Sequence, residues 1–173
     1  MSRRLISSGA KWESEVGYSR AVRTGEHIFV SGTTAVDRRG RVVAPNNAAA
    51  QTRRIFEIIS SALTQAGACL EDVVRTRIFV TDIASDADAI GKVHGEIFGE
   101  IRPTATMVGV SQLIDPRLRV EIELDAIAGC GGCDAVILAG GKSRRMGRDK
   151  HSIRLGRRTL LAHTKAAFVE AGW

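Results

Sequence analysis

Apolar residues recur at three- and four-residue spacing between about Pro45 and Ala66. Such a stripe is typical of a helix that packs one face against a core. Asn46 or Asn47 can cap the start of this helix, and Gly67 can close its end. The stripe consists of Ile55, Ile58, Ile59, Ala62, Leu63 and Ala66.

A second helix is predicted where Ser85 and Asp88 resemble a capping box, in which a short side chain and an acid three residues on satisfy free amides. Gly99 ends this pattern. Its apolar face consists of Ile90, Val93, Ile97 and Phe98.

Alternating patterns predict strands around these helices. In Arg119–Ala126 one face is apolar and the other carries Arg119, Glu121, Glu123 and Asp125. In Val73–Thr81 one face carries Arg75 and Arg77, and the other consists of Val74, Ile78 and Val80. Both strands therefore have one side for a core and one side for solvent or a partner.

Shorter strands complete the predicted order. Ser19–Thr24 and His27–Ser31 flank Gly25-Glu26 as a hairpin, and Ala105–Val110 is a short strand. Strands, helix, strand, helix and strands in this order predict an α+β fold, with two helices on one face of a mixed sheet. The other face is left bare, and a small domain of this kind often oligomerises through it.

Composition divides the chain in two. Residues 1–129 hold 16 Lys+Arg and 16 Asp+Glu, whereas residues 130–173 hold 9 and 3, so the whole net charge of +6 lies in the last part. No apolar run approaches the ~20 residues that span a bilayer, and no signal-peptide core follows the N-terminus. We therefore expect a cytoplasmic protein that uses neither a membrane nor nucleic acid.

A boundary is predicted at Gly129–Cys133, after which a new strand, a Gly-rich loop and a helix over Thr159–Ala171 follow. The predicted organisation is a domain at 1–128, a linker at 129–133 and a second segment at 134–173. The linker holds one CxxC pair, which is half of a zinc site, so we expect no metal.

The first domain resembles the Rid (YjgF) family over residues 1–128. The resemblance rests on the order and spacing of Gly17-Tyr18, the hairpin from Gly25 to Gly32, Ile101-Arg102-Pro103, Thr106-Met107-Val108 and Val120–Glu123. It implies the chorismate-mutase-like α+β fold and a homotrimer with clefts between neighbouring subunits. It also implies hydrolysis of small enamines or imines to a keto acid and ammonia, with no cofactor.

That chemistry requires an arginine fork for a carboxylate, groups that position water, and a carboxylic acid that moves protons. The family's arginine falls at Ala105, its asparagine at Gly91 and a further glutamate at Gly109. Arg102, three residues before Ala105, is the alternative source of charge. Tyr18, Ser31, Gly32 and Glu121 match the family's positions. The resemblance therefore implies Glu121, Tyr18 and Arg102 as candidate catalytic residues. It implies as candidate substrate-binding residues Ser31, Gly32, Ala105 and Thr106.

The second segment resembles the opening of a MobA-like nucleotidyltransferase through Leu138–Lys150, which reads LAGGKSRRMGRDK. The resemblance implies nucleotide binding by Leu138, Ala139, Gly140, Gly141, Arg145 and Lys150. GTP and magnesium are implied only for a full-length domain of this kind. The segment is much shorter than such a domain, so we expect a truncated or vestigial unit without nucleotidyl transfer.

Two other functions stay open. Without the usual arginine, the first domain could be a ligand-binding module with no catalysis. The chain could instead belong to a fusion that serves molybdenum-cofactor nucleotidyl transfer, with the first domain as an accessory. Ribonuclease activity ranks low, because the balanced charge of residues 1–129 offers no electrostatic footprint for RNA.

Overall fold

A computed structural model describes residues 3–132, 154–155 and 158–171 of the 173-residue chain. The chain divides into two compact units, Met1–Cys133 and Asp134–Trp173. None of the helices in these described ranges has the length and apolar character that crossing a bilayer requires.

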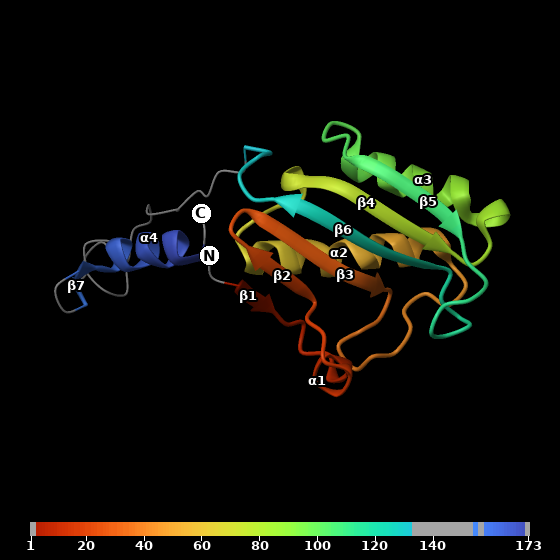
Figure 1. Cartoon of the computed structure of the whole chain (residues 1–173), viewed down its shortest axis with the longest axis horizontal. Helices are drawn as coiled ribbons and strands as arrows, with labels where there is room; N and C mark the ends of the chain where they lie inside the picture. The colour runs from red at the N-terminus through yellow and green to blue at the C-terminus, as the bar shows by residue number, and fades with distance from the viewer. Residues whose placement is uncertain (1–2, 133–153, 156–157, 172–173) are drawn as a thin grey trace, which may run out of the picture. The chain divides into compact units, whose positions relative to one another are not determined.

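The first unit is an α+β domain built on one six-stranded sheet, as the sequence predicts (Figure 1). Its strands lie in the order β1-β2-β3-β6-β4-β5, and only β4 and β5 pair in parallel. In chain order the elements are β1 (Arg3–Ile6), α1 (Lys11–Val16), β2 (Ala21–Thr24), β3 (His27–Thr34), α2 (Ala48–Ala66), the 3-10 turn η1 (Leu70–Asp72), β4 (Val73–Val80), α3 (Ile83–Phe98), β5 (Thr104–Gly109) and β6 (Val120–Ile127).

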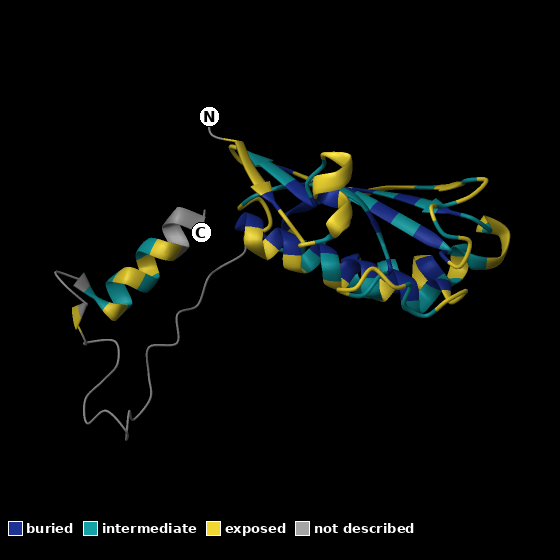
Figure 2. Cartoon of the chain, turned by 90° about the horizontal axis from the view of Figure 1, so that it is seen from below, coloured by how far each residue is buried: buried dark blue, intermediate teal, exposed yellow. Residues whose placement is uncertain are grey.

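Helices α2 and α3 cover the same face of the sheet (Figure 2). The Asn47 side chain accepts a hydrogen bond from the Ala50 N–H at 3.0 Å and so caps α2. Gly67 ends the helix in the left-handed conformation, with φ 77°, which a glycine adopts without steric cost. Both predicted ends of this helix are therefore confirmed.

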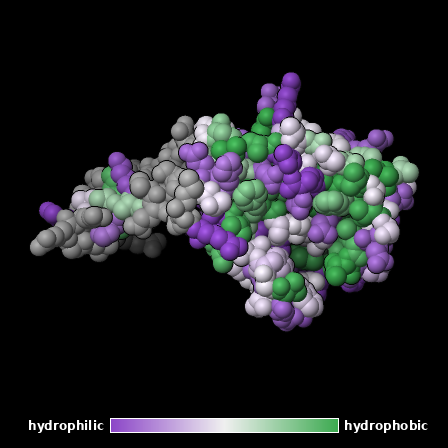
Figure 3. Space-filling model, viewed as in Figure 1, coloured by the Kyte–Doolittle hydropathy of each residue, from purple (hydrophilic) through white to green (hydrophobic). Residues whose placement is uncertain are grey.

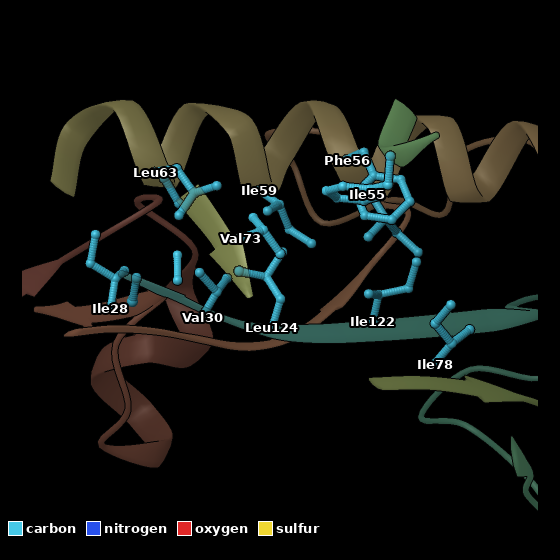
Figure 4. Close-up of a cluster of buried hydrophobic side chains, with 14 of the residues drawn as sticks. Ile28, Val30, Ile55, Phe56, Ile59, Leu63, Val73, Ile78, Ile122 and Leu124 are labelled. Atoms are coloured by element: carbon cyan, nitrogen blue, oxygen red, sulfur yellow. The ribbon is translucent and has the colours of Figure 1, made fainter. Parts of the chain in front are cut away.

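The core lies between α2 and the middle of the sheet (Figure 4). Ile55, Ile59 and Leu63 of α2 are fully buried, and they pack over Ile122 and Leu124 of β6. Each such aliphatic side chain contributes about 1.5–3 kcal/mol when it leaves water. This packing fixes the central strand β6, and with it the acidic residues on the other face of that strand.

Three local predictions need correction. Val74 does not share the inward face of β4, because a register shift between Val73 and Arg75 adds one residue and turns Val73 inward instead. Helix α3 begins earlier than predicted: Asp82, and not Ser85, is its cap and accepts from the Ser85 N–H at 3.2 Å. The short elements β1 and α1 have no counterpart in the predicted order.

The sheet face opposite α2 and α3, called the open face below, carries charged residues in matched pairs. Arg77 of β4 donates two hydrogen bonds of 3.0 Å to the Asp125 carboxylate and also pairs with Glu123. Arg75 lies 3.6 Å from Asp125. Figure 3 views the molecule from this side, where hydrophilic and hydrophobic residues intermingle. Among the exposed apolar side chains here is Phe29 of β3.

In the second unit, β7 (Arg154–Leu155) pairs with β8 (Arg158–Thr159), and α4 (Leu160–Ala171) follows. The helix predicted over Thr159–Ala171 is thus confirmed. The predicted nucleotide-binding residues lie outside the described residues; they are Leu138, Ala139, Gly140, Gly141, Arg145 and Lys150.

Candidate functional site

Four of the residues proposed from the sequence gather at one end of the sheet. They lie around Arg20, which the sequence analysis did not propose. They are Tyr18, Ser31, Gly32 and Glu121. Arg20 lies just before β2, and its carbonyl accepts hydrogen bonds from the Ser31 N–H at 3.0 Å and the Ser31 hydroxyl at 3.2 Å. The pairing of β2 with β3 therefore brings Arg20 beside Ser31.

A bulge in β3 shapes this end of the sheet. Val30 pairs with Leu124 and Thr33 with Ile122, so Ser31 and Gly32 together oppose one residue of β6. A Cβ atom at Gly32 would lie 2.1 Å from Oε1 of Glu121. The Glu121 carboxylate therefore occupies the space that any other residue at position 32 would fill.

Arg20 is the buried cation of the site, with only 8 % of its surface exposed. Its Nη1 donates to the Gly32 carbonyl at 2.9 Å, to Thr33 Oγ1 at 2.8 Å and to Ser31 Oγ at 3.2 Å. Its Nη2 approaches the Tyr18 hydroxyl at 3.5 Å. Its Nε is buried and has no hydrogen-bond acceptor within the part of the chain that the structure describes.

Glu121 is partly buried on the open face, and its burial raises the pKa of its carboxyl above the ordinary 4.5. The positive charge of Arg20 acts in the opposite direction, and the negative charge of Glu123 adds to the rise. A carboxyl whose pKa moves toward the working pH is suited to both taking up and releasing a proton. Burial therefore favours the protonated form of this carboxyl more than it would be favoured in a solvent-exposed glutamate.

Arg102 lies away from Glu121 in a single chain. Glu121 pairs with Phe79 of β4, which pairs with Val108 near the end of β5. Arg102 precedes the start of β5, and the strand from that start to Val108 spans roughly 13 Å. Arg102 is exposed, donates to the Gly99 carbonyl at 3.1 Å and has a left-handed backbone with φ 54°.

The two candidates within β5 lie on opposite sides of that strand. Ala105 pairs with the buried Thr76, so it belongs to the helix-covered side. Thr106 pairs with Arg77 and belongs to the open face. On its other side, Arg77 pairs with Glu123 of β6. Within one chain, neither residue is placed beside Glu121.

Besides Arg20, the sequence analysis missed Glu13 near the site. Glu13 of α1 is buried and accepts hydrogen bonds from Ser8, at 3.0 Å from the N–H and 2.6 Å from the hydroxyl, and from the Ser7 hydroxyl. Burial opposes ionisation of Glu13, but these bonds and the charge of Arg20 together lower its pKa. An isolated acid within a helix of six residues gives no periodic signal that would have revealed it.

Gln51 of α2 holds the two loops that extend from this end of the sheet. Its side-chain amide donates to the Ala44 carbonyl at 3.1 Å and the Arg117 carbonyl at 2.9 Å, and its oxygen accepts from the Arg119 N–H at 2.7 Å. These loops follow β3 and precede β6, whose ends meet where Thr34 pairs with Glu121. The frame of the site is thus fixed from the buried side of the helix.

No group of three or more His, Cys, Asp or Glu side chains that could hold a metal occurs among the described residues. What this end of the sheet offers instead is a carboxyl, two hydroxyls and a buried guanidinium on an α+β scaffold. These features define a small α+β domain with a partly buried carboxyl and a buried guanidinium at one end of its sheet.

Comparison with known proteins gives the family. Residues 9–128 match the model described as Endoribonuclease L-PSP, and the chain belongs to this family, also called YjgF or Rid. Residues 135–173 match the MobA-like NTP transferase domain.

Individual relatives agree with this assignment. The crystal structure of Rv2704 from Mycobacterium tuberculosis, a member of the YjgF/YER057c/UK114 family, is 51 % identical with a TM-score of 0.66, covering 73 % of this chain and all of that one. The uncharacterized protein SCO2049 of Streptomyces coelicolor is 34 % identical over 73 % of this chain and 92 % of its own length. The 3-aminoacrylate deaminase RutC of Acinetobacter baylyi is 39 % identical over 61 % of this chain and 82 % of its own.

Proposed function

We propose that the first unit hydrolyses a small enamine or imine to a carbonyl compound and ammonia. The observation that carries the proposal is the Glu121 carboxyl, which is partly buried, has a raised pKa and lies against Gly32 in the bulge of β3. The similarity to a 3-aminoacrylate deaminase supports the same reaction class.

The chemistry needs one group that can both accept and return a proton. Ionised Glu121 takes a proton from water as the water oxygen bonds to the imine carbon, and solvent supplies one proton to the imine nitrogen. Protonated Glu121 then returns its proton to the nitrogen of the carbinolamine. Ammonia leaves as the carbonyl forms, and the hydroxyl proton of the carbinolamine passes to solvent, which restores the proton that solvent supplied. We assign the hydroxyls of Tyr18 and Ser31 to holding water or substrate. The reaction consumes only water, so the proposal includes no cofactor.

We further propose that the working form is a homotrimer, in which the open face of one subunit meets its neighbour. The exposed Phe29 of β3 supports burial of this face. In such an assembly, Arg102 and Thr106 of a second copy can approach Glu121, which they do not do within one chain. Sedimentation equilibrium tests this, and a monomer at working concentration would contradict it.

The test of the reaction is ammonia release from imines generated in place by an amino-acid oxidase, with and without the protein. Glu121→Gln preserves size and removes the titrating group, so we expect acceleration by the wild type and at least about a 10²-fold loss in this variant. Glu96→Gln is the control, because Glu96 is exposed on α3 and its carboxylate forms an ion pair with Arg53, another exposed side chain. An unchanged rate in Glu121→Gln would remove Glu121 from the mechanism.

A second candidate is a binding module without turnover, favoured by the alanine at position 105 where active relatives are expected to have an arginine. Binding of a small keto acid without any acceleration of imine hydrolysis would support it. RNA cleavage is not proposed, since the positive and negative charges of residues 1–129 balance.

A further inference from the structure

Arg20 is a buried charge that the proposed reaction does not use directly. Removing a guanidinium from water is costly unless its donors are paired. Three of the bonds of Arg20 go to the bulge of β3, yet its Nε–H has no acceptor in the described chain. An unsatisfied buried donor lowers stability, and proteins keep such costs mainly at functional sites.

The bonds of Arg20 fix the surface against which Glu121 packs. Nη1 binds the Gly32 carbonyl, and the Glu121 carboxylate fills the space over the Cα of the same residue. Thr33 and Ser31, on either side of Gly32, are held by the same nitrogen atom. One side chain therefore binds both bulge residues, Ser31 and Gly32, and the residue that follows them, Thr33.

Charges reach Glu121 from several elements. From the segment before β2 comes Arg20, and from its own strand β6 comes Glu123. Glu123 is itself paired with Arg77 of β4, and Arg20 also interacts with Glu13 of α1. Of the two charges that act on the Glu121 carboxyl, Arg20 is the one that favours its ionised form.

We propose that Arg20 is a positioning residue for Glu121: it holds the bulged segment against which the Glu121 side chain rests, and it supplies the positive charge that faces the carboxylate. The catalytic part of this role rests on the hydrolysis proposed above. The geometric and electrostatic part does not depend on it.

Removing the charge should have a specific consequence. Without Arg20, burial and the charge of Glu123 both still favour protonated Glu121, and the opposing positive charge of Arg20 is lost. The carboxylate form then needs a higher pH, and the acid limb of kcat/KM moves upward with it.

The experiment measures the Glu121 pKa by NMR of ¹³C-labelled carboxyl groups, with the Glu121 signal assigned by its loss in Glu121→Gln. We expect Arg20→Met to raise the pKa and to shift the acid limb of the ammonia-release profile by the same amount. Arg23→Met is the matched control, because Arg23 binds the Ala66 and Gly67 carbonyls at the end of α2. It should lower stability without moving the Glu121 pKa.

Arg20→Lys separates charge from geometry. Lysine keeps the positive charge and loses the fork, so we expect the Glu121 pKa to stay near that of the wild type while kcat falls at least about 10-fold. If Arg20→Met does not fold, this variant still decides the matter, since wild-type kcat in Arg20→Lys would overturn the positioning role. An unchanged pKa in folded Arg20→Met would overturn the electrostatic role. If no variant and no wild type releases ammonia while the pKa still rises in Arg20→Met, the hydrolysis proposal fails and the coupling stands.

Discussion

Adding one methyl group at position 32 should displace the group that we consider catalytic. The Cβ of Gly32→Ala would lie 2.1 Å from Oε1 and 3.1 Å from Cδ of Glu121, and Cβ contacts below 3.0 Å do not occur. The backbone of Gly32 lies outside the left-handed region, so alanine itself is not strained there. The Glu121 carboxylate therefore has to move by about 1 Å, which is the difference between 2.1 and 3.0 Å.

A displacement of this size is large for catalysis and small for folding. Misplacing a reacting group by about 1 Å costs on the order of 10²-fold in rate. We expect kcat/KM for ammonia release to fall by about this factor, while the urea midpoint changes little, because the Glu121 side chain is only partly buried and can turn outward.

The control is Gly95→Ala in α3, where a Cβ meets nothing within 4 Å. Alanine in a helix is favoured over glycine by about 1 kcal/mol, so this variant should be slightly more stable and fully active. Wild-type kcat/KM in folded Gly32→Ala would refute the reasoning, since the reaction would then not depend on where the Glu121 carboxylate lies.

Three further outcomes are expected. Folding raises the pKa of Glu121, so the folded state binds the carboxyl proton more tightly than the unfolded state does, and the ionised carboxyl lowers the free energy of unfolding. Glu121→Gln should therefore raise the urea midpoint near pH 7. This increase in the midpoint should vanish near pH 4, where the carboxyl is protonated in both states. Gln51→Leu leaves three backbone groups without their partner and should cost about 2–4 kcal/mol in urea unfolding; a loss below about 1 kcal/mol would mean that water replaces the amide. Arg102→Gly removes the strain of a left-handed backbone and should raise the free energy of unfolding by about 0.5–1 kcal/mol. An accompanying rise in KM would show that the Arg102 side chain binds substrate, and an unchanged KM would exclude that role.

Periodicity was sufficient to predict most of the fold. The α2 stripe and the alternation in β6 each repeat over several turns or residue pairs, so single exceptions do not hide them. The bulge in β4 could not be predicted. One extra residue exchanges the sheet faces of Val73 and Val74, and because both are valines, either arrangement fits the apolar pattern of the sequence. The short α1 lacks enough turns to produce a stripe.

The site was only partly accessible from the sequence. Tyr18, Ser31, Gly32 and Glu121 could be named through the family resemblance, and the structure places them together. Arg20 could not, because an arginine beside a strand is usually solvated, and its burial arises only when the β3 bulge folds over it.

The acidic row along β6 has a consequence for assembly. Glu123 and Asp125 are matched by Arg75 and Arg77 within the same chain, and the charge of Glu121 is opposed by that of Arg20. A face that is neutral within each subunit produces little long-range field, so two copies neither attract nor repel each other at a distance. Association through the open face should therefore proceed at a rate that changes little with ionic strength, unlike encounters between oppositely charged surfaces.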